Sequence, residues 1–499
     1  MSIKASLGLV FAKIICKKIA KWSSNPIETQ QQVFNHLIAT AKNTAFGNDH
    51  HFSAIKTYED FKAQVPVKDY EDIKTYIERI KKGEENVLWP GLPNYFSKTS
   101  GTTSGAKYIP NTKESLNYQV EAARNAILCY INETKKTDFI NGKMIFLQGS
   151  PELDNSLKVP VGRLSGIVAH HVPKYLQKNR LPSYQTNCID DWETKIDAII
   201  EETLPEKMTL ISGIPPWVQM YFDRILEKTG KKNIQEVFPN FSLFIYGGVN
   251  FEPYRAKFEQ TIGKKIDSIE TYPASEGFIA FQDTQTQPGL LLNINAGIFF
   301  EFIPADEYFN DQPTRISLKD VELNKNYALI LNTNAGLWGY SIGDTVKFVS
   351  LNPYRIVVSG RIKHFTSAFG EHVIGEEVDF AIEQACKVIN VDVNEFHVAP
   401  QVTPVSGGMA YHEWFIEFSG EPTKIAEFAE ELDKQLQNKN SYYKDLRKGE
   451  MLDCIKITPI RLGGFNDYMK AEGKLGGQNK LPRLANDRKI AENLITFAK

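Results

Sequence analysis

The chain has 499 residues, 42% of them hydrophobic and 24% charged, and its formal net charge is -2. Because single hydrophobic cores stop growing at about 250–300 residues, two or more domains are expected. The near-neutral charge argues against a surface that coats nucleic acid, which would be strongly basic, so no nucleic acid partner is expected.

The five cysteines are scattered along the chain and form no CxxC pair. This pattern is typical of reduced thiols rather than of a disulfide framework or a zinc site, so we expect a cytoplasmic protein. The adjacent histidine pairs His50-His51 and His170-His171 lack the spacing of a zinc-binding helix.

An apolar run near the N-terminus, Ala5 to Ala12, follows Lys4 and resembles the core of a signal peptide. Lys13 ends the run, and no small-residue cleavage site follows it. The spacing of the apolar residues instead predicts an amphipathic first helix, with contact to a membrane surface as the alternative. The residues at helical spacing are Leu7, Phe11, Ile14, Ile15, Ile19 and Trp22. No apolar segment reaches the ~18 residues of a membrane-spanning helix, so no integral membrane segment is expected.

Residues 1–360 predict a large α/β domain. Helices are expected from Pro26, Tyr58 and Tyr70 and over 113–131, and a short buried strand is expected over 144–147. Farther along, apolar runs alternate with helical segments, which is typical of an α/β sheet. The runs are 241–246, 298–303, 327–331 and 354–358.

A change of pattern near Gly360 predicts a second, smaller domain over residues 361–499. Its expected elements are helices near 373–388 and 423–437, strands near 396–403, 409–418 and 455–460, and a terminal helix. That order is typical of a compact α+β domain.

A loop rich in serine, threonine and glycine occupies residues 97–107, with the sequence Ser-Lys-Thr-Ser-Gly-Thr-Thr-Ser-Gly-Ala-Lys. Its backbone N–H groups, small hydroxyls and Lys107 suit an anion such as phosphate. The spacing differs from that of the Walker loop, because three residues separate Gly101 from Gly105 and Ala106 precedes the lysine. A plain surface turn is the alternative.

Two further stretches follow predicted strands. Paired glycines, Gly247-Gly248, would let a flat ligand approach the backbone, although a simple turn is the alternative. Tyr272 to Gly277 places the Glu276 carboxylate where it could hold Mg²⁺ against phosphate oxygens, with a helix N-cap at Ser275 as the alternative.

The last two stretches lie at Asp344 and near Lys480. Asp344 follows Gly343 in a tight turn and could chelate ribose hydroxyls, although a plain turn aspartate is the alternative. Lys480 stands beyond a glycine-rich loop, and the alternative there is a solvated basic linker.

The order of these stretches along the chain resembles that of adenylate-forming enzymes. The chain is similar to the plant auxin-responsive (Gretchen Hagen) acyl-acid amido synthetases and their bacterial relatives, within the superfamily of acyl-CoA synthetases, luciferases and adenylation domains. The most specific signature is the stretch from Ser100 to Gly105, supported upstream by the pattern around 44–47, 61–70 and 77–84. Ser104 stands where the wider superfamily has glycine, which favours the amido-synthetase branch, and Ser341 stands where it usually has arginine.

The resemblance implies roles for individual residues. The residues implied to bind the nucleotide are Ser100, Thr102, Thr103, Ser104, Lys107, Gly248, Val249, Tyr272, Ser275, Asp344 and Arg361. Glu276 is implied to coordinate Mg²⁺ and Lys480 to act in catalysis, and Lys363 stands at the hinge position. The small domain is implied to rotate over the active site.

The implied function is the ATP- and Mg²⁺-dependent adenylation of a small carboxylic acid, followed by transfer of the acyl group to an amino acid. Such a reaction needs mainly electrostatic help, because it brings anions together. The alternatives are a ligase that forms a thioester with coenzyme A, and a non-catalytic module that binds a nucleotide or an acyl metabolite. We expect a monomer or a small homo-oligomer. Trp217, Tyr221 and the region 161–175 are candidates for the acyl site, although core packing explains any one of them.

Overall fold

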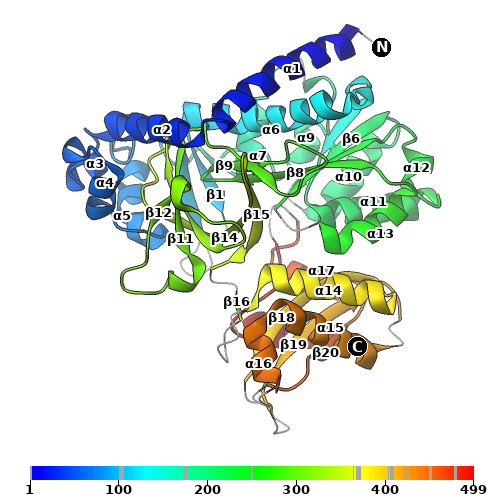
Figure 1. The fold of residues 1–499 in the computed structure, drawn as a ribbon. Coiled ribbons are helices and arrows are strands. Elements are labelled where there is room, and N and C mark those ends of the chain that lie inside the picture. Colours follow the sequence, from blue (N-terminus) through cyan, green and yellow to red (C-terminus); the bar gives the residue numbers. More distant parts are fainter. Residues whose placement is uncertain are drawn as a thin grey trace. The chain divides into compact units, whose positions relative to one another are not determined.

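The computed structural model describes residues 3–99, 106–172, 177–189, 191–248, 251–362, 365–366, 373–402, 404, 409–421, 424–448, 452–476 and 480–499. The chain divides into two compact units. The large unit comprises Met1–Val249, Ile262–Ile342 and Val346–Val357, and the small unit comprises Asn250–Thr261, Gly343–Thr345 and Val358–Lys499. The predicted α/β fold with a large N-terminal part and a smaller C-terminal part is confirmed (Figure 1).

The predicted N-terminal helices are confirmed. They are α1 (Ile3–Ser23), α2 (Pro26–Ala41), α4 (Tyr58–Gln64), α5 (Tyr70–Lys81) and α6 (Lys113–Thr134). A short helix α3 (Ala45–Asp49) and a 3₁₀ turn η1 (Phe52–Ala54), which the sequence analysis did not predict, lie between α2 and α4 in the chain. The starts at Tyr58 and Tyr70 follow from capping boxes, in which Thr57 and Asp69 each bind the first turn of the helix.

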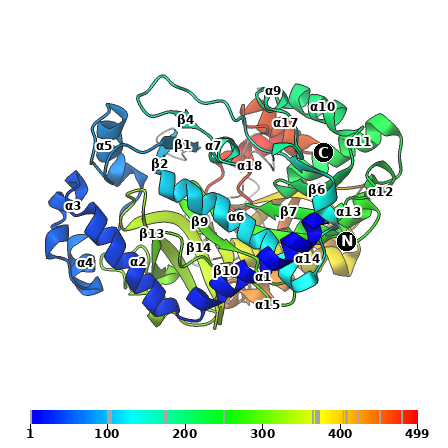
Figure 2. The same cartoon turned by 90° about the horizontal axis from the view of Figure 1, so that it is seen from above.

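The predicted apolar face of α1 is only partly right. Ala12, Ile15 and Ile19 are buried and share a core with Ala126 of α6, along which α1 lies (Figures 1 and 2). Leu7 and Ile14 instead expose 65% and 48% of their surface. Small alanine side chains allow α1 and α6 to approach closely, so the larger apolar residues next to that face remain outside. None of the described helices is both long and apolar enough to cross a lipid bilayer.

A twelve-stranded sheet forms the centre of the large unit, in the order β12-β11-β13-β14-β15-β10-β9-β8-β7-β6-β3-β5. Neighbouring strands are parallel in the run β8-β7-β6-β3-β5. Neighbouring strands are antiparallel in the run β8-β9-β10-β15. The parallel strands are β3 (Lys143–Phe146), β5 (Arg180–Leu181), β6 (Met208–Ser212), β7 (Leu243–Gly247) and β8 (Asp267–Ala274). The others are β9 (Gly277–Phe281), β10 (Leu290–Leu292), β11 (Ile298–Pro304), β12 (Ile316–Ser317), β13 (Asn326–Thr333), β14 (Tyr340–Leu351) and β15 (Tyr354–Arg361).

Helices and 3₁₀ turns connect these strands. They are η2 (Asp138–Asn141), α7 (Leu164–His170), α9 (Tyr184–Asn187), α10 (Trp192–Thr203), α11 (Pro215–Thr229), α12 (Ile234–Val237), α13 (Glu252–Ile262), η3 (Ala305–Glu307) and η4 (Leu318–Asp320). The carboxyl ends of the parallel strands meet at one edge of the sheet, which is where open α/β sheets bind ligands.

A three-stranded sheet, β2-β1-β4, accompanies the large one. It consists of β1 (Tyr95–Thr99), β2 (Lys107–Asn111) and β4 (Val161–Gly162). β1 pairs antiparallel with β2 and parallel with β4. β1 and β4 therefore end on the same side of this sheet.

The small unit has the α+β composition that the sequence predicts. Its sheet has the order β18-β19-β20, from β18 (Val393–Gln401), β19 (Tyr411–Phe418) and β20 (Lys456–Ile460). In addition, β16 (Phe365–Thr366) pairs antiparallel with β17 (Val373–Ile374). Its helices are α14 (Gly375–Ile389), α15 (Ile425–Lys439), α16 (Ser441–Lys448), α17 (Gly464–Ala471) and α18 (Lys489–Leu494), followed by η5 (Ile495–Phe497). Helices α14 and α15 pack together, and their apolar residues share a core with the sheet.

Candidate active site

Glu276 lies in the turn of a β-hairpin at the carboxyl end of β8. Ala274 pairs with Gly277, so Ser275 and Glu276 are the two residues of the turn between β8 and β9. The alternative that Ser275 caps a helix is therefore wrong, because a strand follows the turn. Both turn residues are partly exposed.

The paired glycines end the neighbouring strand β7. A Cβ at Gly247 would lie 2.4 Å from the carbonyl oxygen of Thr271, and Gly248 has φ +87°, a conformation that favours glycine. The Thr271 hydroxyl donates to the carbonyl of Tyr246 at 2.9 Å. Because β7 and β8 are paired, the two glycines without side chains lie at the sheet edge next to the turn that holds Glu276.

Thr271 is a residue of this edge that the sequence reasoning missed. Its carbonyl and hydroxyl both lie against the end of β7, so it fixes the backbone of the glycine pair. The only sequence signal was its position directly before Tyr272 in a predicted strand.

Tyr272 itself is 8% exposed and belongs to an apolar cluster with Ile279, Leu292 and Phe300. A ring packed in this way offers little surface to a ligand at the sheet edge.

Lys107 begins β2, opposite Thr99 of β1, so the two strands bracket the loop between them. Its ammonium lies 5.7 Å from the ring centre of Tyr70, and the hydroxyl of Tyr70 accepts a hydrogen bond from the N–H of Tyr108 at 2.9 Å. Tyr70 of helix α5 therefore fixes the start of β2, directly after the loop. Six of the predicted site residues lie outside the described part of the chain: Ser100, Thr102, Thr103, Ser104, Val249 and Lys363.

In the small unit the structure brings together Asp344, Arg361 and Lys480. Arg361 Nε lies 2.8 Å from Asp344 Oδ1, with 17% of the carboxylate side chain exposed. Gly343, at φ +84°, turns the chain directly before Asp344, and its carbonyl accepts from the N–H of Ile362 at 2.7 Å. The ion pair thus joins the start of β14 to the end of β15.

Lys480 stands where the chain begins to run along β18. The N–H of Val398 donates to the carbonyl of Arg483, and the N–H of Ala485 donates back to Val398. Desolvation lowers the pKa of Lys480 to about 8; the Asp344 carboxylate opposes this shift and Arg361 adds to it. By surface area Lys480 is nevertheless an exposed residue.

The ranges that the structure describes contain no group of three or more histidine, cysteine, aspartate and glutamate side chains placed to hold a metal ion. Magnesium is commonly bound through one or two carboxylates, with substrate phosphates and water completing its shell. A single carboxylate in a partly exposed turn, as at Glu276, fits that mode of binding.

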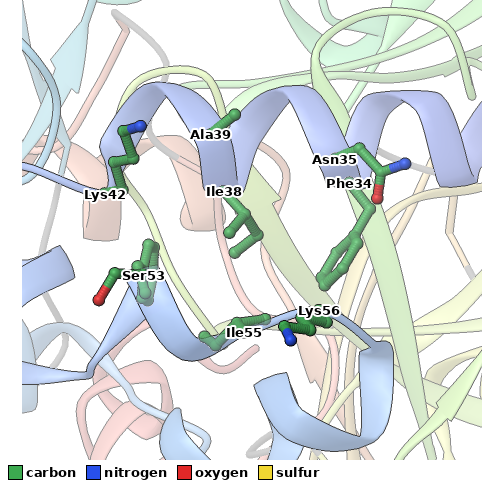
Figure 3. Close-up of a pocket in the computed structure, with 9 residues that line it drawn as sticks. Phe34, Asn35, Ile38, Ala39, Lys42, Ser53, Ile55 and Lys56 are labelled. Carbon is green, nitrogen blue, oxygen red and sulfur yellow. The ribbon is translucent and has the colours of Figure 1, made fainter.

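A hollow of about 220 Å³ lies between α2 and the segment around η1 (Figure 3). Phe34 and Ile38 face Ile55 and Lys56 across it. None of its lining residues belongs to the sheet edge or to the Asp344 group, so it is separate from the candidate site.

Three family models match the chain. The GH3 family N-terminal domain matches residues 15–266, the GH3 family central domain residues 291–361 and the GH3 family C-terminal domain residues 376–489.

Similar proteins include a jasmonoyl–L-amino acid synthetase, JAR4, from Nicotiana attenuata, with 23% identity over 85% of each chain. An indole-3-acetic acid-amido synthetase, GH3.4, from Arabidopsis thaliana has 22% identity over 66% of each chain. Among solved structures, the GH3.15 acyl acid amido synthetase has the same fold, with a TM-score of 0.80 at 14% identity, covering 97% of this chain and 96% of that one. A 2-hydroxyisobutyryl-CoA ligase is more distant, at a TM-score of 0.60 and 13% identity over 94% and 92% of the chains.

The family match spans both units, and the first family model alone covers more than half of the 499 residues. The chain therefore belongs to the GH3 family.

Proposed function

We propose that this protein activates a small carboxylic acid with ATP and transfers the acyl group to an amino acid, forming an amide. The observation that carries the proposal is the match over 85% of both chains to a jasmonoyl–L-amino acid synthetase, together with the family models along the chain. The solved structure of the GH3.15 acyl acid amido synthetase, which shares the fold, is consistent with it.

In the first half-reaction a carboxylate oxygen of the acid attacks the α-phosphorus of ATP, and pyrophosphate leaves. No general base is required, because the carboxylate is already ionised at pH 7. In the second half-reaction the amine nitrogen attacks the carbonyl carbon, AMP leaves and the amine loses a proton. Both steps depend mainly on positioning and on stabilisation of charge.

In this proposal the large unit supplies the residues that bind the phosphates, the adenine and the magnesium ion. Ser100, Thr102, Thr103, Ser104 and Lys107 hold the phosphates. Gly248 and Val249 approach the adenine. The absence of side chains at the glycine pair that ends β7 leaves room for such a contact with the backbone. Tyr272, which is 8% exposed, borders the base, and Ser275 lies beside the phosphates in the turn with Glu276.

Magnesium would be held by Glu276, and it supplies positive charge that neutralises the pyrophosphate group as it leaves. The partial exposure of the turn supports this assignment, since the ion needs room for phosphate and water ligands.

The small unit supplies the remaining groups. Asp344 binds the ribose hydroxyls, and Arg361 holds its carboxylate in place through their 2.8 Å ion pair. Lys480 stabilises the negative charge at the α-phosphorus during attack. In this proposal the C-terminal domain predicted from the sequence, residues 361–499, rotates about Lys363 to exclude water from the reactive acyl-adenylate.

Exchange of radiolabelled pyrophosphate into ATP tests the first half-reaction. A panel of small carboxylic acids should contain at least one acid that stimulates exchange, with no amino acid present. If no acid in a broad panel does so while the folded protein still binds ATP, the non-catalytic alternative replaces this proposal.

A further inference from the structure

Two arginines of the large unit meet at the segment that follows β3. Arg163 comes directly after β4, and a Cβ at Gly149 would lie 2.7 Å from its Cδ atom. Arg180, in β5, donates from its guanidinium to the Oε1 atom of Gln148 at 2.6 Å. The Cδ atom of Arg163 and the guanidinium of Arg180 therefore approach adjacent residues of one short loop, although the two residues come from different parts of the chain.

Neither arginine has an acidic partner among the described residues. The other arginines of the large unit each pair with a carboxylate, and the pairs are Arg79–Glu84, Arg124–Glu121, Arg224–Asp197, Arg315–Glu301 and Arg355–Asp283. Burial lowers the pKa of Arg163 and lowers that of Arg180 to about 10, and no neighbouring charge opposes either shift. Burying a cation without a counter-charge is unfavourable, so a bound anion would stabilise the two guanidinium groups in this position.

A hydroxyl without a partner lies at the same place. The Oγ atom of Ser165 is buried and makes no hydrogen bond within the described residues. It lies 3.5 Å from the position that a Cβ at Gly149 would occupy. The missing side chain at Gly149 thus allows the aliphatic part of Arg163 to pack against the loop, next to the Ser165 hydroxyl that has no partner among the described residues.

The location suits a substrate group. β3 pairs with β6, and β6 pairs with β7, so the loop after β3 lies at the same sheet edge as Gly248. At about 4.8 Å between neighbouring strands, two strands separate them by roughly 10 Å. On the other side, β4 runs parallel to β1, and Arg163 leaves β4 where β1 leads toward the serine- and threonine-rich loop. In Figure 2 helix α7, which begins directly after Arg163, lies beside β1 and β4.

We propose that Arg163, Arg180 and Ser165 bind a substrate carboxylate that is not the one being activated. The inference rests on the proposed function, because that reaction brings such a group to the site. One source is the α-carboxylate of the amino acid; the other is a second carboxylate at the far end of a dicarboxylic acid. A guanidinium and a hydroxyl are suited to either, since both donate to carboxylate oxygens.

The variants Arg163→Gln and Arg180→Gln test the cluster, each beside the charge-conserving Arg163→Lys or Arg180→Lys. Arg224→Gln is the matched control, because Arg224 pairs with Asp197 on the exposed surface of the same unit. The first experiment measures KM for hexanoate and for adipate in pyrophosphate exchange, without amino acid. If the cluster binds the acid, Arg163→Gln should raise KM for adipate about 10- to 100-fold and leave KM for hexanoate unchanged.

The second experiment measures amide formation with L-alanine and with L-alaninamide, which lacks the carboxylate. If the cluster binds the amino acid, the same variant should raise KM for L-alanine about 10- to 100-fold, with L-alaninamide and the exchange reaction unaffected. In either case the lysine variant should recover part of the loss, and Arg224→Gln should behave as the wild type.

Unchanged KM values for adipate and for L-alanine in both glutamine variants would overturn the inference. So would an equal loss with hexanoate and adipate, because the cluster would then hold the reacting carboxylate. Calorimetric titration of the wild type and the variants with adipate and with L-alanine measures the same contact without turnover. Titration therefore reports on this subsite alone. Failure of the proposed reaction would appear differently, as wild-type protein that exchanges no pyrophosphate with any acid.

Discussion

Arg361 and Asp344 form an ion pair of 2.8 Å that joins the end of β15 to the start of β14. Arg361 is 48% exposed at its side chain, and exposed pairs stabilise a fold by only about 0–1 kcal/mol. The pair therefore contributes little to the stability of the small unit, and its main role is to position Asp344 in the proposed ribose site.

Asp344→Ala should raise KM for ATP about 10- to 100-fold, because hydrogen bonds to a charged group are lost, and should change the melting temperature little. Pyrophosphate exchange at varied ATP concentration, with thermal unfolding of the same samples, measures both quantities. Asp467→Ala, which breaks the exposed pair with Arg461, is the control. A fall in melting temperature with an unchanged KM for ATP would assign Asp344 a structural role instead.

Lys480→Ala should reduce the rate of adenylation at least a hundredfold while leaving ATP binding nearly intact, since the ammonium is proposed to act on the charge of the transition state. Pyrophosphate exchange gives the rate, and calorimetric titration with ATP gives the affinity. Equal losses in the two measurements would contradict the catalytic assignment.

The lowered pKa of Lys480, about 8, predicts a pH dependence. The ammonium is the active form, so the adenylation rate should fall as the pH rises through this value. Lys480→Arg, if active, should remove the fall, because a guanidinium stays protonated. Asp344→Asn should move the fall to lower pH, since the carboxylate raises the pKa of Lys480. A wild-type rate that is constant from pH 7 to 10 would exclude this role of the ammonium.

Gly247→Ala should destabilise the large unit by about 1–3 kcal/mol, because its Cβ would lie 2.4 Å from the Thr271 carbonyl oxygen. Urea unfolding of the variant should show a lower midpoint. Gly420→Ala is a matched control, since nothing lies within 4 Å of a Cβ at that position. Equal midpoints for both variants would mean that β7 and β8 can separate without loss.

The buried pair of Arg315 and Glu301 should matter more for stability than any surface pair. Glu301 is 0% exposed at its side chain and also accepts from the Tyr58 hydroxyl and the Asn332 amide, both at 2.9 Å. Arg315→Leu leaves a buried carboxylate without its cation, which should lower the free energy of unfolding by about 3–5 kcal/mol. Arg224→Gln should change it by less than about 1 kcal/mol, and a similar loss in both variants would show that burial is not the cause.

The sequence predicted the local features of this molecule better than its long-range ones. The helix starts at Tyr58 and Tyr70 could be predicted because the capping residues stand directly before them. The strand at 144–147 could be predicted from its apolar run, and the structure places β3 over Lys143–Phe146.

The contacts that were not predicted join residues far apart in the chain. Tyr58 and Glu301 are 243 residues apart, and no local pattern shows that they meet in one buried network. The exposed Leu7 and Ile14 of α1 show the same limit, because helical spacing identifies an apolar stripe but not which part of it a neighbouring helix covers. No local sequence pattern predicts that Arg163 and Arg180 contact the same loop, because only the folded sheet brings them there.

The most direct test of the account is identification of the product by mass spectrometry. The wild-type protein is incubated with ATP, Mg²⁺ and an acid that supports pyrophosphate exchange, with either a mixture of amino acids or coenzyme A as the acceptor. The proposed reaction yields an N-acyl amino acid and AMP, formed only when ATP is present, and no thioester. A thioester of coenzyme A as the sole acyl product would contradict it.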